Sequence, residues 1–396
     1  MMKKGLIIII FLFFAIFFSP VSRTRVFATQ TTQEIEEEKI LEEIESQIDE
    51  MDFSDIEQFY EENINFESFE DRSFVEVIKS MISGEVVLGF DEIIESVLSA
   101  IKIDIIAVLK LVALLVVIVG FGAFSDMLRS SKKESGGMSG VVNYLILTII
   151  LSLVASIVAD FVLETTSLLS RIKGLMEVLF PILLSLVVTV GGSGLGATLQ
   201  PAVVVLTNGV IGLVTTVTTI VVSLYLVLSV VGELTDFIKL DKLKGFVVST
   251  YKWVIGLIFT IFMGYLSVNG ILASGRDGIS VKTAKYALRS YLPIVGGYVS
   301  DSYEIFRAGS VLIKNSVGVF GVVLLFGLVV GKVLTMSVYN LGFKLASGLS
   351  EPFGMNKITR FLSSLSTLFS FLIAGIVACF LLSIITLLVF VSSANI

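Results

Sequence analysis

Long apolar stretches separated by short polar segments fill the chain from residue 105 to its end. Runs of about 18 or more residues with few charges are typical of membrane-spanning helices, because a helix needs about 20 apolar residues to cross the hydrocarbon core. The regular runs are residues 105–124, 141–163, 253–273, 316–339 and 361–391. The pattern therefore predicts an all-α integral membrane protein with about six or seven transmembrane helices.

The stretch from residue 175 to residue 231 is less regular and predicts interrupted or re-entrant segments. Its first part, 175–190, is short for a span and contains Glu177 and Pro181, whereas its second part, 201–231, is long for one untilted span. One interpretation is two tilted spans joined by a glycine-rich turn, which gives seven spans. The other is a re-entrant or broken helix followed by one span, which gives six spans and an external C-terminus.

The segment 1–28 has the pattern of a secretory signal peptide. Lys3 and Lys4 precede an apolar stretch at 6–18, Pro20 ends that stretch, and small or tolerated residues come just before residue 29. This order matches a positively charged segment, an apolar segment and a cleavage site. An uncleaved anchor helix is the alternative, and both interpretations export the segment that follows.

Residues 29–104 form an acidic domain, with 23 acidic against 4 basic side chains. Narrow apolar stripes recur at helical spacing within it, together with an aromatic cluster between Phe53 and Phe69. These faces are too narrow for a large core of their own, so we expect short helices that pack on the membrane domain or on a partner. A solvated, partly disordered tail is the alternative. Residues 105–396 then form the polytopic transmembrane domain.

The basic residues give a partial orientation. The short loop 126–140 is basic, and the positive-inside rule places it in the cytoplasm, which agrees with an extracytoplasmic acidic domain. Beyond the second span the rule decides nothing. In the seven-span interpretation, the inside loops and the outside loops each carry nine Lys and Arg residues.

The composition excludes several kinds of chemistry. Hydrophobic residues make up 55% of the chain and charged residues 16%, the mean hydropathy is +0.95, and there is no histidine. A chain without histidine has no Ser-His-Asp triad, no His-bound zinc and no imidazole base. The single cysteine, Cys379, lies in an apolar run, which excludes a disulfide or thiolate cluster within one chain. EF-hand and phosphate-loop spacings are also missing, so we expect no enzyme, no catalytic residue, no metal, no cofactor and no nucleic-acid partner.

Interrupted helices are the first candidates for function, as a conduit, its gate or a hinge, because unwound backbone at membrane depth needs protein or water around it. The glycines and prolines at the two breaks are Gly191, Gly192, Gly194, Gly196, Pro201, Pro293, Gly296 and Gly297. Ionisable residues at membrane depth are also candidates for function by default. The alternative is that they only snorkel to the interface or pair with an opposite charge. These residues are Lys110, Asp160, Glu177 and Lys332.

The polar segment 274–315 contains a short basic amphipathic helix on which Lys282, Lys285 and Arg289 share one face. Such a face suits the headgroups of membrane lipid or an acidic partner, and a solvated face is the alternative. In the next span, Gly327 and Gly331 have the small-xxx-small spacing that predicts close helix packing.

Residues 282–321 read KTAKYALRSYLPIVGGYVSDSYEIFRAGSVLIKNSVGVFG, and this segment closely resembles the signature region of the stage III sporulation protein AE family of endospore-forming bacteria. Other features follow in the family's order: the secretory leader, Ser83-Gly84-Glu85, the glycine break before Gln200-Pro201, and Glu351-Pro352-Phe353. The similarity covers essentially the whole mature chain. Gly297-Tyr298 departs from the more polar residue expected there and leaves the contacts of that turn open.

The resemblance implies a polytopic protein of the mother-cell membrane that faces the forespore. The family belongs to a channel-like secretion or feeding complex of the stage III operon proteins AA to AH, which supports forespore development after engulfment. That complex reaches the forespore membrane through stage II sporulation protein Q. A separate ATPase would supply energy, because this chain has no phosphate-binding loop. A stand-alone secondary transporter of a small solute and a purely structural scaffold are the alternative interpretations.

Overall fold

The computed structural model describes residues 43–63, 73–83, 90–130, 137–190, 200–201, 203–235, 239–291 and 296–392. Every regular element within these ranges is a helix, which confirms the predicted all-α class. Six long helical segments are apolar enough to cross a membrane. They belong to α5 (Phe90–Ser130), α6 (Gly137–Thr189), α8 (Ile211–Leu234), α9 (Asp241–Tyr291), α10 (Gly296–Ser350) and α11 (Asn356–Ser392).

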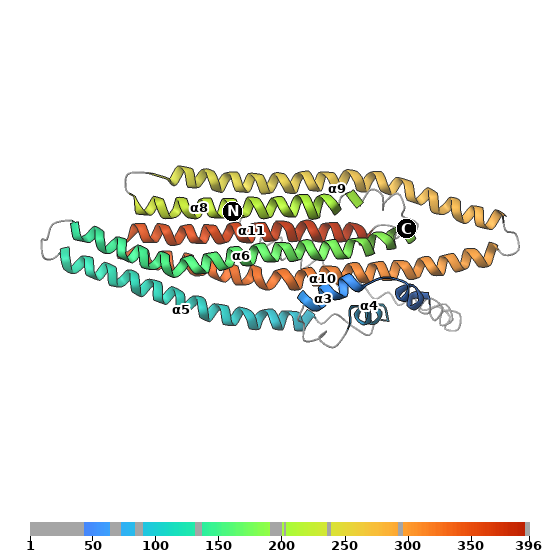
Figure 1. Ribbon diagram of the computed structural model, residues 1–396, viewed down its shortest axis with the longest axis horizontal. Coiled ribbons are helices and arrows are strands. Elements are labelled where there is room, and N and C mark those ends of the chain that lie inside the picture. The colour runs from blue at the N-terminus through green and yellow to red at the C-terminus, as the bar shows by residue number, and fades with distance from the viewer. Residues whose placement is uncertain are drawn as a thin grey trace. The chain divides into compact units, whose positions relative to one another are not determined.

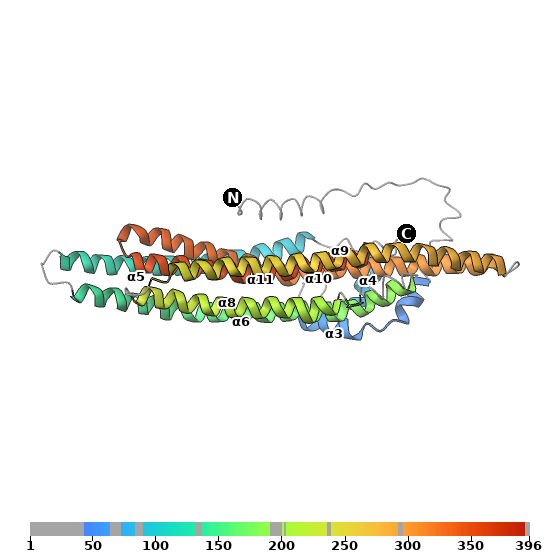
Figure 2. The same cartoon turned by 90° about the horizontal axis from the view of Figure 1, so that it is seen from above.

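Consecutive long helices run in opposite directions and lie side by side (Figures 1 and 2). The last residues of α5, α8 and α10 and the first residues of α6, α9 and α11 lie at one end of the bundle, which we call the Ser350 end. The last residues of α6 and the first residues of α10 lie toward the opposite end, which we call the Thr189 end. Short connections of this kind are typical of antiparallel helix bundles.

α11 packs against α6, α8, α9 and α10, and α5 packs on α10 and α6 (Figure 1). α11 is apolar on nearly all sides, which is the pattern of a helix surrounded by other helices. The ring of Phe369 lies 5.0 Å from that of Phe161 on α6, and the ring of Phe371 lies 5.3 Å from Tyr225 on α8 and 4.9 Å from Tyr251 on α9. α10 packs along the same helix, so the core of the bundle is filled by the side chains of α11 and its neighbours.

α6 is one continuous helix of 53 residues, whereas the sequence predicted a polar loop between spans near residues 164–174. The predicted loop is wrong because apolar side chains continue to recur at helical spacing through it, and Leu168, Ile172 and Leu175 are buried. Pro181 does not end the helix, and it lies on the exposed side. The seven-span interpretation, which needed a crossing on each side of this loop, therefore gives way to six spans.

The outer face of α6 changes its chemistry near Glu164. Between residues 144 and 163 its exposed side chains include the large apolar or aromatic Tyr144, Leu145, Ile149 and Leu163, together with the small Thr148, Ser152, Ala155, Ser156 and Ala159 and the charged Asp160. Between residues 165 and 189 the exposed side chains are Thr166, Ser167, Ser170, Arg171, Glu177, Pro181, Ser185 and one large apolar residue, Val188. The candidate span of 46 residues is about 69 Å long, whereas the hydrocarbon core is about 30 Å thick. We infer that the first half of α6 crosses the membrane and that the second half projects beyond it.

The long apolar run 201–231 is also a single path through the membrane. It passes through a π-helical turn, η2 (Val205–Val210), and continues as α8 without a break. A π-helical turn widens the backbone by one residue and is often found at functional sites. The residues between α6 and this helix, 191–199, lie outside the described part of the chain.

Part of the acidic domain packs against the bundle as short helices, in agreement with the sequence-based expectation. Residues 43–49 are helical, and α3 (Ser54–Asn63) and α4 (Phe74–Ser83) follow. The ring of Phe320 on α10 lies 5.5 Å from Phe74 and 6.0 Å from Tyr60. Gln47 donates to the Phe306 carbonyl oxygen (3.0 Å) and accepts a hydrogen bond from Ser310 Oγ (2.6 Å). The docked side of this segment is therefore aromatic at its centre and hydrogen-bonded at one edge.

Two groups of this segment have altered acidity. Burial raises the pKa of Tyr60 to about 12. The hydroxyl and the backbone N–H of Ser54 both donate to Asp52 Oδ1, at 2.6 and 3.0 Å, and these bonds lower the pKa of the Asp52 carboxyl. The second bond also satisfies a backbone donor in the first turn of α3.

Candidate functional site

The glycine and proline breaks proposed as a conduit, gate or hinge fall mostly outside the described residues. Those outside are Gly191, Gly192, Gly194, Gly196 and Pro293. Pro201 lies in helical backbone shortly before η2 and is exposed, and Gly296 and Gly297 are the first residues of α10. The break near Pro293 therefore separates two long helices, α9 and α10.

The basic residues Lys282, Lys285 and Arg289 lie on the helical backbone of α9. A helix is present where the sequence predicted one. It is continuous with the preceding membrane span, however, and α9 extends unbroken from Asp241 to Tyr291.

The charges predicted at membrane depth divide into paired and exposed groups. Lys332 on α10 forms an ion pair with Glu164 on α6, and Glu177 lies 3.5 Å from Lys173 one helical turn away. Lys110 and Asp160 are exposed on α5 and α6. Pairing thus accounts for two of the four, and Glu164 is a partner that the sequence did not single out, because it lies just past the predicted end of a span.

The predicted packing of Gly327 and Gly331 stays a prediction, and close helix contacts are found at other glycines. Gly327 is half-buried, and a Cβ atom added to Gly331 would meet open space. By contrast, a Cβ atom on Gly375 of α11 would lie 2.7 Å from Thr218 Oγ1 and 3.2 Å from the Tyr251 hydroxyl. The missing side chain at Gly375 makes room for a polar contact between helices.

That contact is a chain of hydrogen bonds in the core. The hydroxyl groups of Thr218 on α8 and Tyr251 on α9 lie 3.0 Å apart, and the Tyr251 hydroxyl donates to the Phe371 carbonyl oxygen of α11 at 2.8 Å. Asn340 on α10 donates to the Ser366 carbonyl oxygen of α11 at 2.8 Å. Such bonds between helices stabilise a membrane bundle in which lipid offers polar groups no alternative partner.

A buried ion cluster at the Ser350 end joins three helices. Glu233, near the end of α8, is only 1% exposed, and its carboxylate lies 3.2 Å from Lys244 Nζ of α9 and 3.0 Å from the Arg360 guanidinium of α11. A buried carboxylate is stable only when it is paired in this way. Gly232 leaves room for the lysine, since a Cβ atom there would lie 3.4 Å from Lys244 Nζ. The sequence did not identify this cluster, because Glu233 follows an apolar run and resembles a loop residue.

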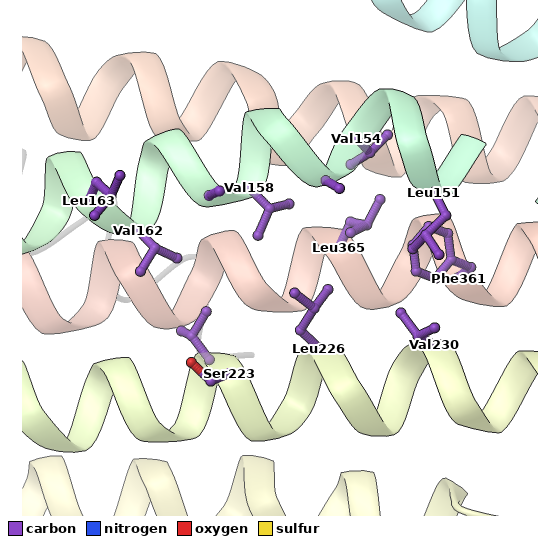
Figure 3. A pocket seen from close by; sticks show the side chains of 13 residues that line it. Leu151, Val154, Val158, Val162, Leu163, Ser223, Leu226, Val230, Phe361 and Leu365 are labelled. Carbon is purple, nitrogen blue, oxygen red and sulfur yellow. The ribbon is translucent and has the colours of Figure 1, made fainter. Parts of the chain in front are cut away.

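A groove of about 380 Å³ lies between α6 and α8, with α11 as its floor (Figure 3). Its lining is apolar apart from Ser223 of α8. The lining residues are Leu151, Val154, Ala155, Val158, Ala159, Val162, Leu163, Val222, Ser223, Leu226, Val230, Phe361 and Leu365. One end of the groove adjoins the ion cluster, because Phe361 follows Arg360 and Val230 lies one helical turn before Glu233.

The arrangement offers a binding surface and polar contacts that hold neighbouring helices together. Among the described residues, no group of three or more His, Cys, Asp and Glu side chains could hold a metal ion. Most buried polar side chains of the described core bond to backbone carbonyls, to other side chains or to opposite charges, whereas Asn315 Oδ1, Thr359 Oγ1 and Ser383 Oγ are buried without a hydrogen-bond partner. The site is therefore best described as an apolar groove that ends at a buried, charged junction of three helices.

Comparisons with known proteins place this architecture in a family. Residues 72–394 match the family model of Stage III sporulation protein AE. Stage III sporulation protein AE of Bacillus subtilis (strain 168) is 24% identical over 318 residues, which cover 80% of this chain and 79% of that protein. No solved structure matches the chain. Because the family model extends over most of its length, the chain belongs to the stage III sporulation protein AE family.

Proposed function

We propose that this protein is a membrane subunit of a multi-protein sporulation channel complex between the mother cell and the forespore. The observation that carries the proposal is the family match over residues 72–394. The complex would contain the other stage III operon proteins, AA to AH, with a separate ATPase among them. Stage II sporulation protein Q would connect it to the forespore membrane, and the complex would sustain forespore development.

The packing of the bundle favours a structural role for each copy of the chain. Each copy would form part of the wall around a passage or would anchor other subunits. In the described part of the bundle, large apolar side chains fill the space between α11 and its neighbours, among them Phe361, Phe369 and Phe390. The groove at α6 and α8 is apolar and carries no charged side chain. A polar solute needs polar groups or water along its path. We therefore propose that any passage runs between subunits, and that a stand-alone transporter is the less favoured function.

The proposed orientation places the Ser350 end in the cytoplasm of the mother cell. The three segments at this end, 126–140, 235–244 and 344–360, carry three Lys or Arg residues each. The six-span path brings all three to the same side, whereas the opposite side has Arg171 and Lys173 on α6 and six Lys or Arg residues in segment 274–315. The proposed orientation therefore rests on the basic loop 126–140 and on the signal peptide. The signal peptide would export the acidic domain to the opposite side, where α3 and α4 cover α6 and α10.

Deletion of the chain in a sporulating host tests the proposal. Forespore development should stop after engulfment and should be restored by the wild-type chain. The purified protein in liposomes should move no small solute by itself. Normal spore yield without the chain, or solute flux by the purified chain alone, would contradict the proposed function.

The breaks at Gly191–Gly196 and Pro293–Gly297 remain our proposed gate or hinge. Replacement of Pro293 and Gly296 together by alanine should abolish complex function while the protein level stays normal. Replacement of Gly256 by alanine is the matched control, because a Cβ atom there meets open space. Normal spore yield in the Pro293 and Gly296 variant would refute a role for that break.

A further inference from the structure

We propose that the groove between α6 and α8 binds one acyl chain of an anionic phospholipid, whose headgroup lies at the Ser350 end. The inference requires only that the helices span a membrane. It is independent of the complex to which the protein belongs.

The length and volume of the groove fit an acyl chain. Its lining on α6 extends from Leu151 to Leu163, which is about 18 Å at the helical rise, so an extended hydrocarbon chain can lie along it. The groove offers about 380 Å³. It therefore has room for one extended chain of methylenes.

The lining of the groove is suited to hydrocarbon. Ala155 and Ala159 on α6 are exposed small residues that keep the groove open, and Leu226 and Val230 on α8 form the facing wall (Figure 3). Ser223 contributes the single hydroxyl among the lining side chains. A groove of this composition offers water almost no hydrogen-bonding partner, so lipid from the surrounding membrane is the occupant that it favours.

The charges at the end of the groove select the headgroup. Arg360 lies directly before the lining residue Phe361, and its side chain is 55% exposed while it bonds to Glu233. Lys357, one turn earlier on α11, lies over the ring of Tyr144 with its nitrogen 4.8 Å from the ring centroid. Arg360 therefore adjoins the mouth of the groove, and Lys357 lies farther toward the Ser350 end, at Tyr144, seven residues or about 10 Å along α6 before the lining residue Leu151. A phosphate group would lie between the two cations.

Further cations lie at the same end of the bundle. Lys239 and Lys242 are exposed at and just before the start of α9. The three segments at this end, 126–140, 235–244 and 344–360, contain nine Lys and Arg residues against five Asp and Glu residues. This excess of positive charge favours an anionic headgroup over a zwitterionic one.

The test is to count the phospholipids that remain bound to the full-length protein. The protein is purified in a mild detergent, delipidated, and exposed to equal amounts of phosphatidylglycerol and phosphatidylcholine with the same acyl chains. Native mass spectrometry then counts the bound lipids. The wild type should retain one phosphatidylglycerol per chain.

Three variants separate the parts of the proposal. Ala159→Phe fills the groove from an exposed position and should reduce lipid retention at least tenfold. Val227→Phe is the matched control, since Val227 is an exposed α8 residue outside the groove lining, and it should retain lipid as the wild type does. Lys239→Gln with Lys242→Gln should lower the preference for phosphatidylglycerol about tenfold or more. Unchanged gel-filtration profiles and melting temperatures show that the variants are folded.

Several results would overturn the proposal. Equal lipid retention by the wild type and Ala159→Phe would mean that the groove is not the site. Equal retention of the two lipids by the wild type would refute the headgroup selection. A copurifying membrane peptide or a second copy of the chain that Ala159→Phe displaces would identify the occupant as protein.

Discussion

The buried ion cluster at the Ser350 end makes a sharp prediction about stability. Glu233 is 1% exposed and Lys244 is 10% exposed, whereas Arg360, the second cation on the same carboxylate, is 55% exposed. Replacement of Lys244 by methionine keeps the length and apolar stem of the side chain and removes its charge. Glu233 then loses the partner that shares its desolvated environment.

The two cations of the cluster should differ in their contributions because they differ in exposure. Removal of one partner of a buried ion pair typically costs about 3–5 kcal/mol, so Lys244→Met should lower the free energy of unfolding by about 3 kcal/mol or more. The guanidinium of Arg360 is screened by solvent, and Arg360→Gln should cost about 1 kcal/mol. A double variant, Glu233→Gln with Lys244→Met, removes both buried charges and should recover most of the loss caused by Lys244→Met.

The assay is unfolding of each variant in the same detergent, followed by circular dichroism and by the thermal midpoint. The predicted order of stability is wild type, Arg360→Gln, the double variant, and Lys244→Met. Equal losses from Lys244→Met and Arg360→Gln would refute the argument from burial. A double variant as unstable as the sum of its single variants would show that the two charges do not interact.

Other contacts yield further predictions. Phe74→Ala removes a buried ring of the docked acidic segment and should weaken the packing of this segment on the bundle by about 3–5 kcal/mol. The effect should be seen as rapid proteolysis of residues 43–83 in the intact protein. Gly375→Val should lower the thermal midpoint through a clash with Thr218 worth about 1–3 kcal/mol, whereas Gly256→Ala should leave the midpoint unchanged or higher. Burial raises the pKa of Tyr60 to about 12, so the folded state binds this proton more tightly than the unfolded state. Stability should fall as pH rises from about 10 to about 12, and this fall should be smaller in Tyr60→Phe.

The sequence predicted the helical class and most membrane spans because their apolar runs are long and continuous. It failed at residues 164–174, where Arg171 and Lys173 suggested a loop. Arg171 is exposed and Lys173 is half-buried, while Leu168 and Ile172 continue the buried side of α6. A helix can leave the membrane and remain helical because it packs against other helices. Counting charges along the sequence does not distinguish such a helix from a loop.

The contacts between helices were harder to foresee. Glu233 and Glu164 follow apolar runs and resemble the ends of spans, yet Glu233 pairs with Arg360 and Glu164 pairs with Lys332, both far away in the sequence. The spacing of Gly327 and Gly331 is common in membrane helices, and spacing alone does not tell which face of α10 meets a neighbour. Gly375, which has the tight contact, is a lone glycine in an apolar run and carries no such signal.

Affinity capture of the tagged protein from membranes of sporulating cells tests the proposed function most directly. Gentle solubilisation followed by identification of the copurifying proteins should recover the separate ATPase and other stage III operon subunits in stable amounts. Recovery of this protein alone, from membranes in which those subunits are present, would contradict the proposal that it is a subunit of a sporulation channel complex.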